Sequence, residues 1–215
     1  MSSKKLTKKQ ESNICLDCGE CCRKYWITVF PEEATKIAKN MKIPKKKFLE
    51  EYCELFVKAY PKSTPGTLTY PTTFFPKRIY HKLEKEAGTL PVSFFIVPQI
   101  VMRRHGKACF FLNEDNSCKI YKSRPEPCQL FPFIAVPGYR ENYPFCPLYK
   151  TEQKDYTKKS RAYFKKVKKY FKDVEKKGFK NYWKTPPASG NLFLTDRKIG
   201  KISLEEIEII QGQYD

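Results

Sequence analysis

Eight of the nine cysteines of this 215-residue chain fall into two groups, and the first group is compact. It reads C-L-D-C-G-E-C-C and contains Cys15, Cys18, Cys21 and Cys22. A C-x-x-C pair can bring two thiolates to one metal, and Gly19 relaxes the backbone where it must bend. Tandem C-x-x-C-x-x-C is typical of loops that bind a [4Fe–4S] cluster, whereas structural zinc sites more often use two separate C-x-x-C knuckles. The spacing therefore favours an iron–sulfur cluster, with zinc as the alternative.

The adjacent cysteines Cys21 and Cys22 indicate more than one simple tetrahedral site. If this segment is extended, neighbouring side chains point to opposite sides, and the two thiols cannot easily serve one small ion. We expect one of them to face a second metal centre or a remote cysteine. The sequence thus predicts two centres or one enlarged site.

The second group of cysteines is spread over the middle of the chain and consists of Cys109, Cys118, Cys128 and Cys146. Cys128 follows two prolines, which pre-set the backbone and keep a ligand loop rigid. A site made of thiolates is negative overall, and the permanent charge of Arg124 is suited to compensate it. Tyr121 either contacts the same region or packs against its neighbours. The ninth cysteine, Cys53, lies on the apolar face of an expected helix, so we expect it to pack in the core.

The chain is strongly basic, with 42 Lys and Arg against 23 Asp and Glu and a net charge of +19. Such a charge favours acidic protein partners and nucleic acids without choosing between them. The densest basic face predicts a polyanion-binding surface at Lys165, Lys166, Lys168 and Lys169. No apolar run reaches the roughly 20 residues that span a bilayer, and the N-terminus has no secretory pattern. We therefore expect a cytoplasmic protein with reduced thiols; its oligomeric state is not predicted.

Hydrophobic periodicity and proline placement predict the elements that position these cysteines. We expect helices from Pro31 to Met41, from Lys45 to Ala59, from Ile79 to Ala87, from Tyr156 to Lys177 and over the last dozen residues. Val97–Arg103 and Ala108–Leu112 are expected to pair as a small hairpin. The predicted fold class is α-rich with a small β element, an irregular helical domain organised around cysteine-bearing metal loops. The predicted domains are a basic flexible arm at 1–13, a metal-binding domain at 14–150, and a basic helix with C-terminal extension at 151–215.

The motifs C-x-x-C-G-x-C-C, C-x-F-L, C-x-I-Y-x-x-R-P-x-x-C-x-x-F-P and a late cysteine resemble the YkgJ-type cysteine-cluster family. The resemblance covers about Cys15 to Cys146 and implies a zinc- or iron-chelating domain. That family includes the flagellin lysine N-methylases. The resemblance therefore implies an iron–sulfur cluster, use of S-adenosylmethionine and an activity like that of a protein-lysine methyltransferase.

Three functions follow from these patterns. The first is an iron–sulfur enzyme that resembles a methyltransferase. The second is a non-catalytic module whose fold is stabilised by zinc or an iron–sulfur cluster and that binds an acidic partner or nucleic acid. The third is an electron carrier. The cysteine pattern favours metal binding in all three, and the catalytic residues are not predicted.

Overall fold

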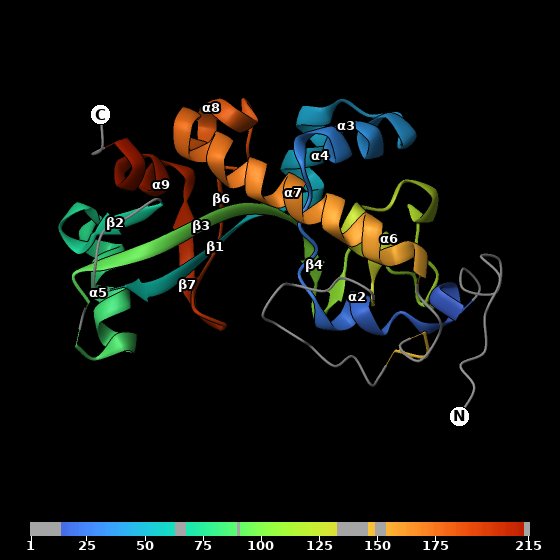
Figure 1. Ribbon diagram of the computed structural model, residues 1–215, viewed down its shortest axis with the longest axis horizontal. Coiled ribbons are helices and arrows are strands. Elements are labelled where there is room, and N and C mark those ends of the chain that lie inside the picture. Colours follow the sequence, from blue (N-terminus) through green and yellow to red (C-terminus); the bar gives the residue numbers. More distant parts are fainter. Residues whose placement is uncertain (1–13, 63–67, 90, 133–145, 149–153, 213–215) are drawn as a thin grey trace. The chain divides into compact units, whose positions relative to one another are not determined.

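The computed structural model describes residues 14–62, 68–89, 91–132, 146–148 and 154–212 (Figure 1). The expected basic arm at 1–13 lies outside the described residues. The chain divides into two compact units. Unit 1 comprises Met1–Ile43 and Met102–Lys168, and unit 2 comprises Pro44–Val101 and Lys169–Asp215. The eight cysteines of the two groups all belong to unit 1, and Cys53 belongs to unit 2.

Unit 1 consists of short elements joined by turns. In chain order these are a helical turn at 14–18, α2 (Glu20–Lys24), α3 (Pro31–Asn40), β4 (Arg104–His105), β5 (Ala108–Cys109), η2 (Tyr121–Ser123), α6 (Glu126–Leu130) and the first part of α7 (Lys154–Lys177). Helix α3 begins at a proline, as predicted, and the Glu33 carboxylate accepts a 2.8 Å hydrogen bond from the Phe30 N–H. This bond satisfies a donor that the helix itself leaves without a partner.

The predicted hairpin is wrong in its first strand, because Ser93–Met102 forms a strand of a different sheet, and the hairpin of unit 1 begins instead at Arg104 and His105, which were expected in the turn. Arg104 pairs with Cys109 and His105 pairs with Ala108 in an antiparallel two-stranded sheet. The turn passes through Gly106, whose φ of 58° lies in the left-handed region that favours glycine. The hairpin brings Cys109 to a defined strand position beside α2, which contacts β5.

Unit 2 is built on a mixed sheet with the strand order β2-β3-β1-β6-β7. Its strands are β1 (Cys53–Lys62), β2 (Thr69–Pro71), β3 (Ser93–Met102, whose last residue belongs to unit 1), β6 (Ser189–Leu194) and β7 (Arg197–Ser203). Its helices are α4 (Lys45–Tyr52), η1 (Thr72–Phe74), α5 (Lys77–Ala87), the end of α7, α8 (Phe179–Trp183) and α9 (Leu204–Gln211). Strand β1 runs parallel to β6, whereas β2–β3 and β6–β7 are antiparallel.

The prediction of an α-rich fold with a small β element is wrong, because this five-stranded sheet organises unit 2. The error is clearest at the helix expected from Lys45 to Ala59. That helix ends at Tyr52, and the chain continues as β1, in which Leu55, Val57 and Ala59 are fully buried. Short apolar runs fit a buried strand as well as a helix face. Pairing with β6, whose Leu192 lies opposite Val57, selects the strand.

The core of unit 2 contains large side chains from its helices and from its sheet. Phe48, Leu55, Phe94, Phe179 and Trp183 are all at most 2% exposed. A buried polar link joins them, in which the Trp183 indole N–H donates to the Tyr170 hydroxyl at 3.3 Å. That hydroxyl in turn donates to the Pro98 carbonyl at 2.9 Å. Buried Tyr and Trp need such partners, so this part of the core is both apolar and hydrogen-bonded.

No helix in the described part of the chain combines the length and the apolar character that crossing a bilayer requires.

Candidate metal centre

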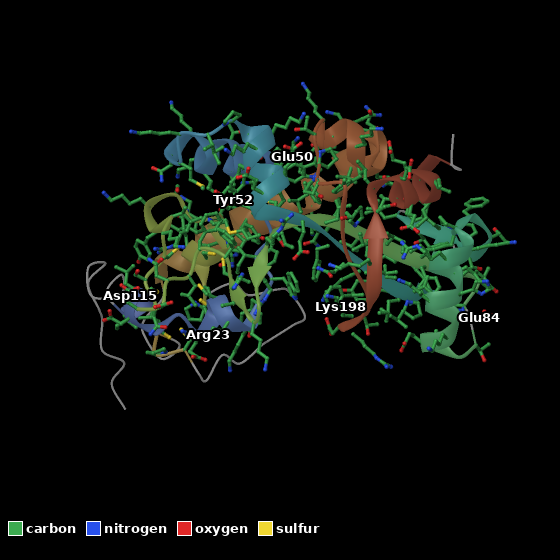
Figure 2. The ribbon with its side chains drawn as sticks, turned by 180° about the vertical axis from the view of Figure 1, so that it is seen from behind. Arg23, Glu50, Tyr52, Glu84, Asp115 and Lys198 are labelled. Carbon is green, nitrogen blue, oxygen red and sulfur yellow. The ribbon has the colours of Figure 1, made fainter. Side chains whose placement is uncertain are left out.

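The predicted ligand cysteines lie on six separate segments of unit 1. Cys15 and Cys18 belong to the helical turn at 14–18, Cys21 and Cys22 to α2, Cys109 to β5, Cys118 to the segment before η2, Cys128 to α6, and Cys146 to the described stretch 146–148. All eight are free thiols, and all but the buried Cys109 are half-buried. In Figure 2, yellow sulfur atoms gather in the same part of the chain as the labelled Arg23.

The electrostatics of these thiols shows that most of them share one neighbourhood. A hydrogen bond to Cys22 and burial raise the pKa of Cys21. Burial raises the pKa of Cys109 to about 11, and it also raises the pKa values of Cys118 and Cys128. The negative charge of Cys22 adds to the increase at all four cysteines, and that of Cys15 adds to it at Cys21.

Cys22 has the opposite shift: its pKa is lowered, so it carries more negative charge at neutral pH than the cysteines whose pKa is raised. The hydrogen bond from Cys21 lowers its pKa to about 7, with the charges of Arg23, Arg124 and Arg104 acting in the same direction. A thiolate with a lowered pKa is both the nucleophile and the metal ligand among cysteine forms. Cys22 is therefore better prepared to bind a metal at neutral pH than Cys21, Cys109, Cys118 or Cys128.

The extended geometry expected for Cys21 and Cys22 is wrong, because both lie within the helix α2. Successive side chains on a helix diverge by about 100° rather than pointing to opposite sides. The two thiols are hydrogen-bonded to each other. The adjacency of Cys21 and Cys22 therefore does not by itself assign them to different centres.

Arginines surround the ionised thiol, and only one of them was predicted. The charge of Arg124 favours the ionised forms of Cys22, Cys118 and Cys128, although burial dominates at the last two and their pKa values are raised; its compensating role at a metal centre stays a prediction. Its guanidinium carbon lies 3.7 Å from the centre of the Tyr121 ring, so Tyr121 serves as the surface on which Arg124 rests.

Arg23 and Arg104 are the functional neighbours that sequence reasoning missed. Arg104 donates to the Tyr25 carbonyl at 2.8 Å and to the Arg23 carbonyl, and it packs over the Trp26 ring at 5.2 Å. Arg23 is adjacent to Cys22 in the sequence, which was an available signal. Arg104 reaches the site only through the hairpin, so no local pattern could have indicated it.

A contact at Gly19 ties the first cysteine loop to the loop before Cys118. Gly19 has a φ of 63°, and a Cβ there would stand 2.8 Å from Arg23 Nη1 and 3.3 Å from Asn116 Cβ. Arg23 also donates to the Asn116 side chain, whose amide donates to the Asp17 carbonyl at 3.2 Å. Glycine is required here both for its conformation and for the close approach of the two loops.

Glu33 holds the short helix that carries Cys128. Its two carboxylate oxygens accept the backbone N–H groups of Phe30, at 2.8 Å, and of Glu126, at 2.6 Å. Burial raises the pKa of Glu33, against the lowering effect of these two bonds. The side chain thus joins the start of α3 to the start of α6 and fixes the position of Cys128 relative to α3.

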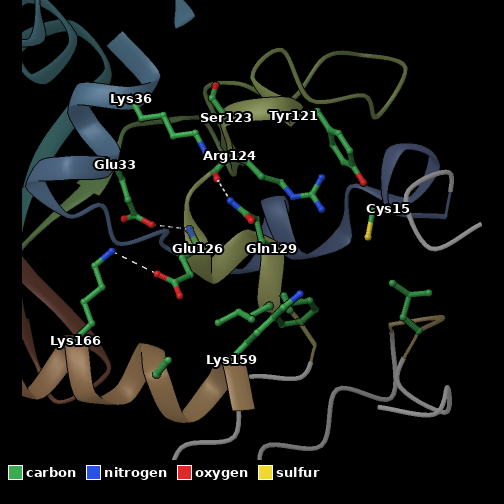
Figure 3. Close-up of a pocket in the computed structure, with 14 residues that line it drawn as sticks. Cys15, Glu33, Lys36, Tyr121, Ser123, Arg124, Glu126, Gln129, Lys159 and Lys166 are labelled. Carbon is green, nitrogen blue, oxygen red and sulfur yellow. Dashed lines mark hydrogen bonds and ion pairs between the residues drawn. The ribbon is translucent and has the colours of Figure 1, made fainter. Parts of the chain in front are cut away.

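A cavity of about 610 Å³ lies beside this arrangement, entirely within unit 1 (Figure 3). Its charged lining comes from α3, α6, α7 and the segment between η2 and α6, and consists of Glu33, Lys36, Arg124, Glu126, Lys159 and Lys166. Cys15 and Tyr121 complete one side of it. One of the predicted ligands therefore borders a space large enough for a small molecule.

The lysines that were predicted to bind a polyanion do not form one uniform surface. Lys165 and Lys168 are exposed. Lys166 instead contacts Glu32 at 2.9 Å and Glu126 at 3.3 Å, and Lys169 contacts Asp173 at 2.8 Å. Two of the four charges are thus balanced within the chain itself.

The donor set fits a thiolate-bound metal group. At least six thiols and three arginines influence one another's ionisation, which is the combination that a negatively charged thiolate centre requires. Among the described residues, no group of three or more His, Cys, Asp and Glu side chains is already arranged to hold a metal ion. The thiols are gathered but do not form a closed single-ion site.

A comparison with protein families agrees with the chemistry of this donor set. The family model described as "CxxCxxCC: Putative zinc- or iron-chelating domain" matches residues 14–161, well over half of the chain. No curated protein and no solved structure matches this chain. The chain belongs to the CxxCxxCC family of zinc- or iron-chelating domains, and the family resemblance read from the cysteine motifs is confirmed.

Proposed function

We propose that this member of the CxxCxxCC family is an iron–sulfur protein whose centre is ligated by the cysteines of unit 1. The observation that carries the proposal is the position of Cys22, whose charge raises the pKa of four other cysteines. Those four come from α2, β5, the segment before η2, and α6. Several thiols around one ionised cysteine suit a multinuclear cluster better than a single tetrahedral ion.

The residues around the thiols have separate roles in this proposal. Thiols bind metal as thiolates, so the protons of Cys21, Cys109, Cys118 and Cys128 would leave on binding. Arg23, Arg104 and Arg124 would then compensate the thiolate charge. Glu33 would hold α6, and with it Cys128, in position. When bound, an iron–sulfur cluster supplies one-electron transfer or a site at which a substrate can bind iron.

The metal is tested by analysing the full chain after anaerobic purification. The proposal predicts iron and acid-labile sulfide in comparable amounts, with broad visible absorption that bleaches on reduction. Zinc without iron or sulfide would contradict the iron–sulfur assignment and leave only the coarser conclusion of a metal-chelating domain.

One observation favours an enzyme over an electron carrier. Cys15 lines the cavity of about 610 Å³, so a predicted ligand borders a space of the size that small-molecule sites occupy. An electron carrier needs a cluster near the surface but no such space. The activity to test first is the S-adenosylmethionine-dependent lysine methylation that the family resemblance implies.

This second proposal is tested with the iron-loaded protein, labelled S-adenosylmethionine and a lysine-rich acceptor protein. Transfer of label that disappears in a Cys15→Ser variant would support it. A reversible redox couple without any transfer of label would instead assign the protein as an electron carrier.

A further inference from the structure

We propose that the cavity beside Cys15 is a binding site for a small anion that bears a carboxylate, held by Arg124 and Lys36. The cavity measures about 610 Å³, and all of its lining residues belong to unit 1. This volume lies within the range of roughly 300–1,000 Å³ that is typical of small-molecule sites. The site needs no metal for its own ligand contacts.

Arg124 is the first of the two binding residues because its guanidinium is both fixed and incompletely satisfied. The guanidinium carbon packs 3.7 Å from the centre of the Tyr121 ring, which holds the plane of the group. Its Nε is buried and has no hydrogen-bond partner among the described residues. Figure 3 shows the group directed into the space between Tyr121 and Cys15. A buried unpaired N–H is costly, and a carboxylate matches the planar fork of an arginine with two parallel hydrogen bonds.

Lys36 supplies a second positive charge from a different element. It lies on α3, is exposed to solvent and lines the cavity. In Figure 3 its side chain extends from α3 toward Ser123 and Arg124. An ammonium beside a guanidinium favours an anion with more than one oxygen acceptor.

The acidic residues of the cavity are already engaged with protein partners. Glu33 accepts the N–H groups of Phe30 and Glu126, and the Glu126 carboxylate accepts from Lys166 at 3.3 Å. Lys166 also contacts Glu32 at 2.9 Å. These contacts balance negative charge against donors within unit 1. Lys159 also lines the cavity, and we assign Arg124 and Lys36 as the residues that bind the anion because Arg124 has the buried Nε without a partner and Lys36 extends toward it.

The site is also electrostatically connected to the thiols. Arg124 is one of the charges that lower the pKa of Cys22, Cys118 and Cys128. An anion bound to Arg124 would share this positive charge with the thiolates. Binding should therefore perturb the visible spectrum of the metal-loaded protein as well as produce heat.

The test is calorimetric titration of the metal-loaded full chain with citrate, and with inorganic phosphate in a second series. We expect saturable citrate binding that Arg124→Gln weakens about tenfold or more, as expected for loss of a charge-assisted bidentate contact. The matched control is Arg161→Gln, which removes the same charge from an exposed position of α7 outside the cavity lining. It should change the affinity less than twofold.

Lys36→Gln keeps the test decisive if Arg124→Gln fails to fold, because Lys36 is exposed and its loss should not disturb packing. We expect this variant to weaken citrate about threefold, as for the loss of a partly solvated charge. Equal weakening by Arg161→Gln would overturn the proposal, since it would indicate non-specific attraction to a basic protein. Tighter binding of phosphate than of citrate would overturn the carboxylate assignment. Metal content is measured on the same samples, so that weaker citrate binding with the metal retained is attributed to the cavity residues and not to loss of the metal centre. Absence of citrate binding by the unaltered metal-loaded chain would overturn the anion site and leave the metal assignment standing.

Discussion

The two units differ in what holds them together. Among the described residues, eleven of the twelve largest fully buried side chains belong to unit 2, and Ile37 is the one in unit 1. Unit 2 carries the five-stranded sheet, whereas the sheet of unit 1 is a hairpin of two residue pairs. Unit 1 instead contains the gathered thiols, the arginines around Cys22 and the Glu33 contacts.

This difference indicates two sources of stability in one chain. Burial of large apolar side chains stabilises unit 2 in the way usual for globular proteins. Among the described residues, unit 1 has the smaller sheet and fewer of the largest fully buried side chains, and gathering protonated thiols contributes little without a ligand. Metal binding can supply folding free energy to such a region. We therefore expect unit 1 to depend on its metal and unit 2 to be independent of it.

The largest expected effect is the loss of the centre in Cys22→Ser. Serine removes the ionised thiol around which the other cysteines gather, so we expect iron content to fall to background and unit 1 to become sensitive to protease. The measurement is metal analysis with limited proteolysis. Cys53→Ala is the control, because Cys53 is fully buried in unit 2. This variant should retain the iron content of the unaltered protein. Equal iron in both variants would contradict the assignment of Cys22.

Truncation of a large side chain in the core of unit 2 should destabilise unit 2 and leave the iron of unit 1 in place. Phe94 lies in β3, and its side chain is completely buried, with 0% exposed. Phe94→Ala should lower the free energy of unfolding of unit 2 by about 3–5 kcal/mol, through lost burial and a residual cavity. Urea titration followed by the fluorescence of Trp183 measures it, in a Trp26→Phe background because Trp26 lies in unit 1. If the iron is lost at the same urea concentration as unit 2 unfolds, the two sources of stability are not separate.

Glu33→Gln should weaken the support of Cys128 without removing a ligand. The amide can accept with only one of its two end groups, so the N–H of Phe30 or of Glu126 loses its acceptor, at a cost of about 1–3 kcal/mol. We expect faster loss of iron to a chelator. Glu32→Gln is the control, since Glu32 is exposed and its contact with Lys166 should contribute less than about 1 kcal/mol. Identical chelation rates for the two variants would remove Glu33 from the positioning role.

The smallest effect concerns the ionisation of Cys22 in the metal-free protein. Its pKa of about 7 lies below the ordinary value of 9.0, so alkylation by iodoacetamide should be half-maximal near pH 7. Because the folded pKa is lowered, the ionised thiol stabilises unit 1 fully above the ordinary value, and this contribution is lost as pH falls through about 7. Arg104→Gln should move the alkylation midpoint upward. A midpoint near 9 in the unaltered protein would contradict the arginine environment.

Helices with regular apolar spacing over several turns could be predicted from the sequence. Helix α3 has a proline start and regular apolar spacing, and α7 has an apolar stripe over many turns, so both were expected close to their observed bounds. The sheet could not be predicted in the same way, because β1 pairs with β6 more than a hundred residues later. The β6–β7 hairpin was missed although Thr195 and Asp196 form a turn between strand-like runs.

The site was predictable in residue type but not in arrangement. Cysteine spacing predicted the thiols and Arg124 as site residues, because those patterns are local. The position of Arg104 depends on the β4–β5 hairpin, and the role of Glu33 depends on the approach of α6 to α3. The helical conformation of Cys21 and Cys22 was missed because the tandem cysteine motif was read as extended, whereas residues 20–24 form α2.

The most direct test of the account is hydrogen exchange of the anaerobically purified chain before and after removal of its metal by a chelator. If a thiolate-bound metal holds unit 1 together, the amides of α2, α6 and the β4–β5 hairpin should lose protection when the metal leaves. The amides of β1, β3 and β6 should keep theirs, because the core of unit 2 is unchanged. Equal protection of unit 1 with and without metal would contradict the claim that a thiolate-bound metal holds it together.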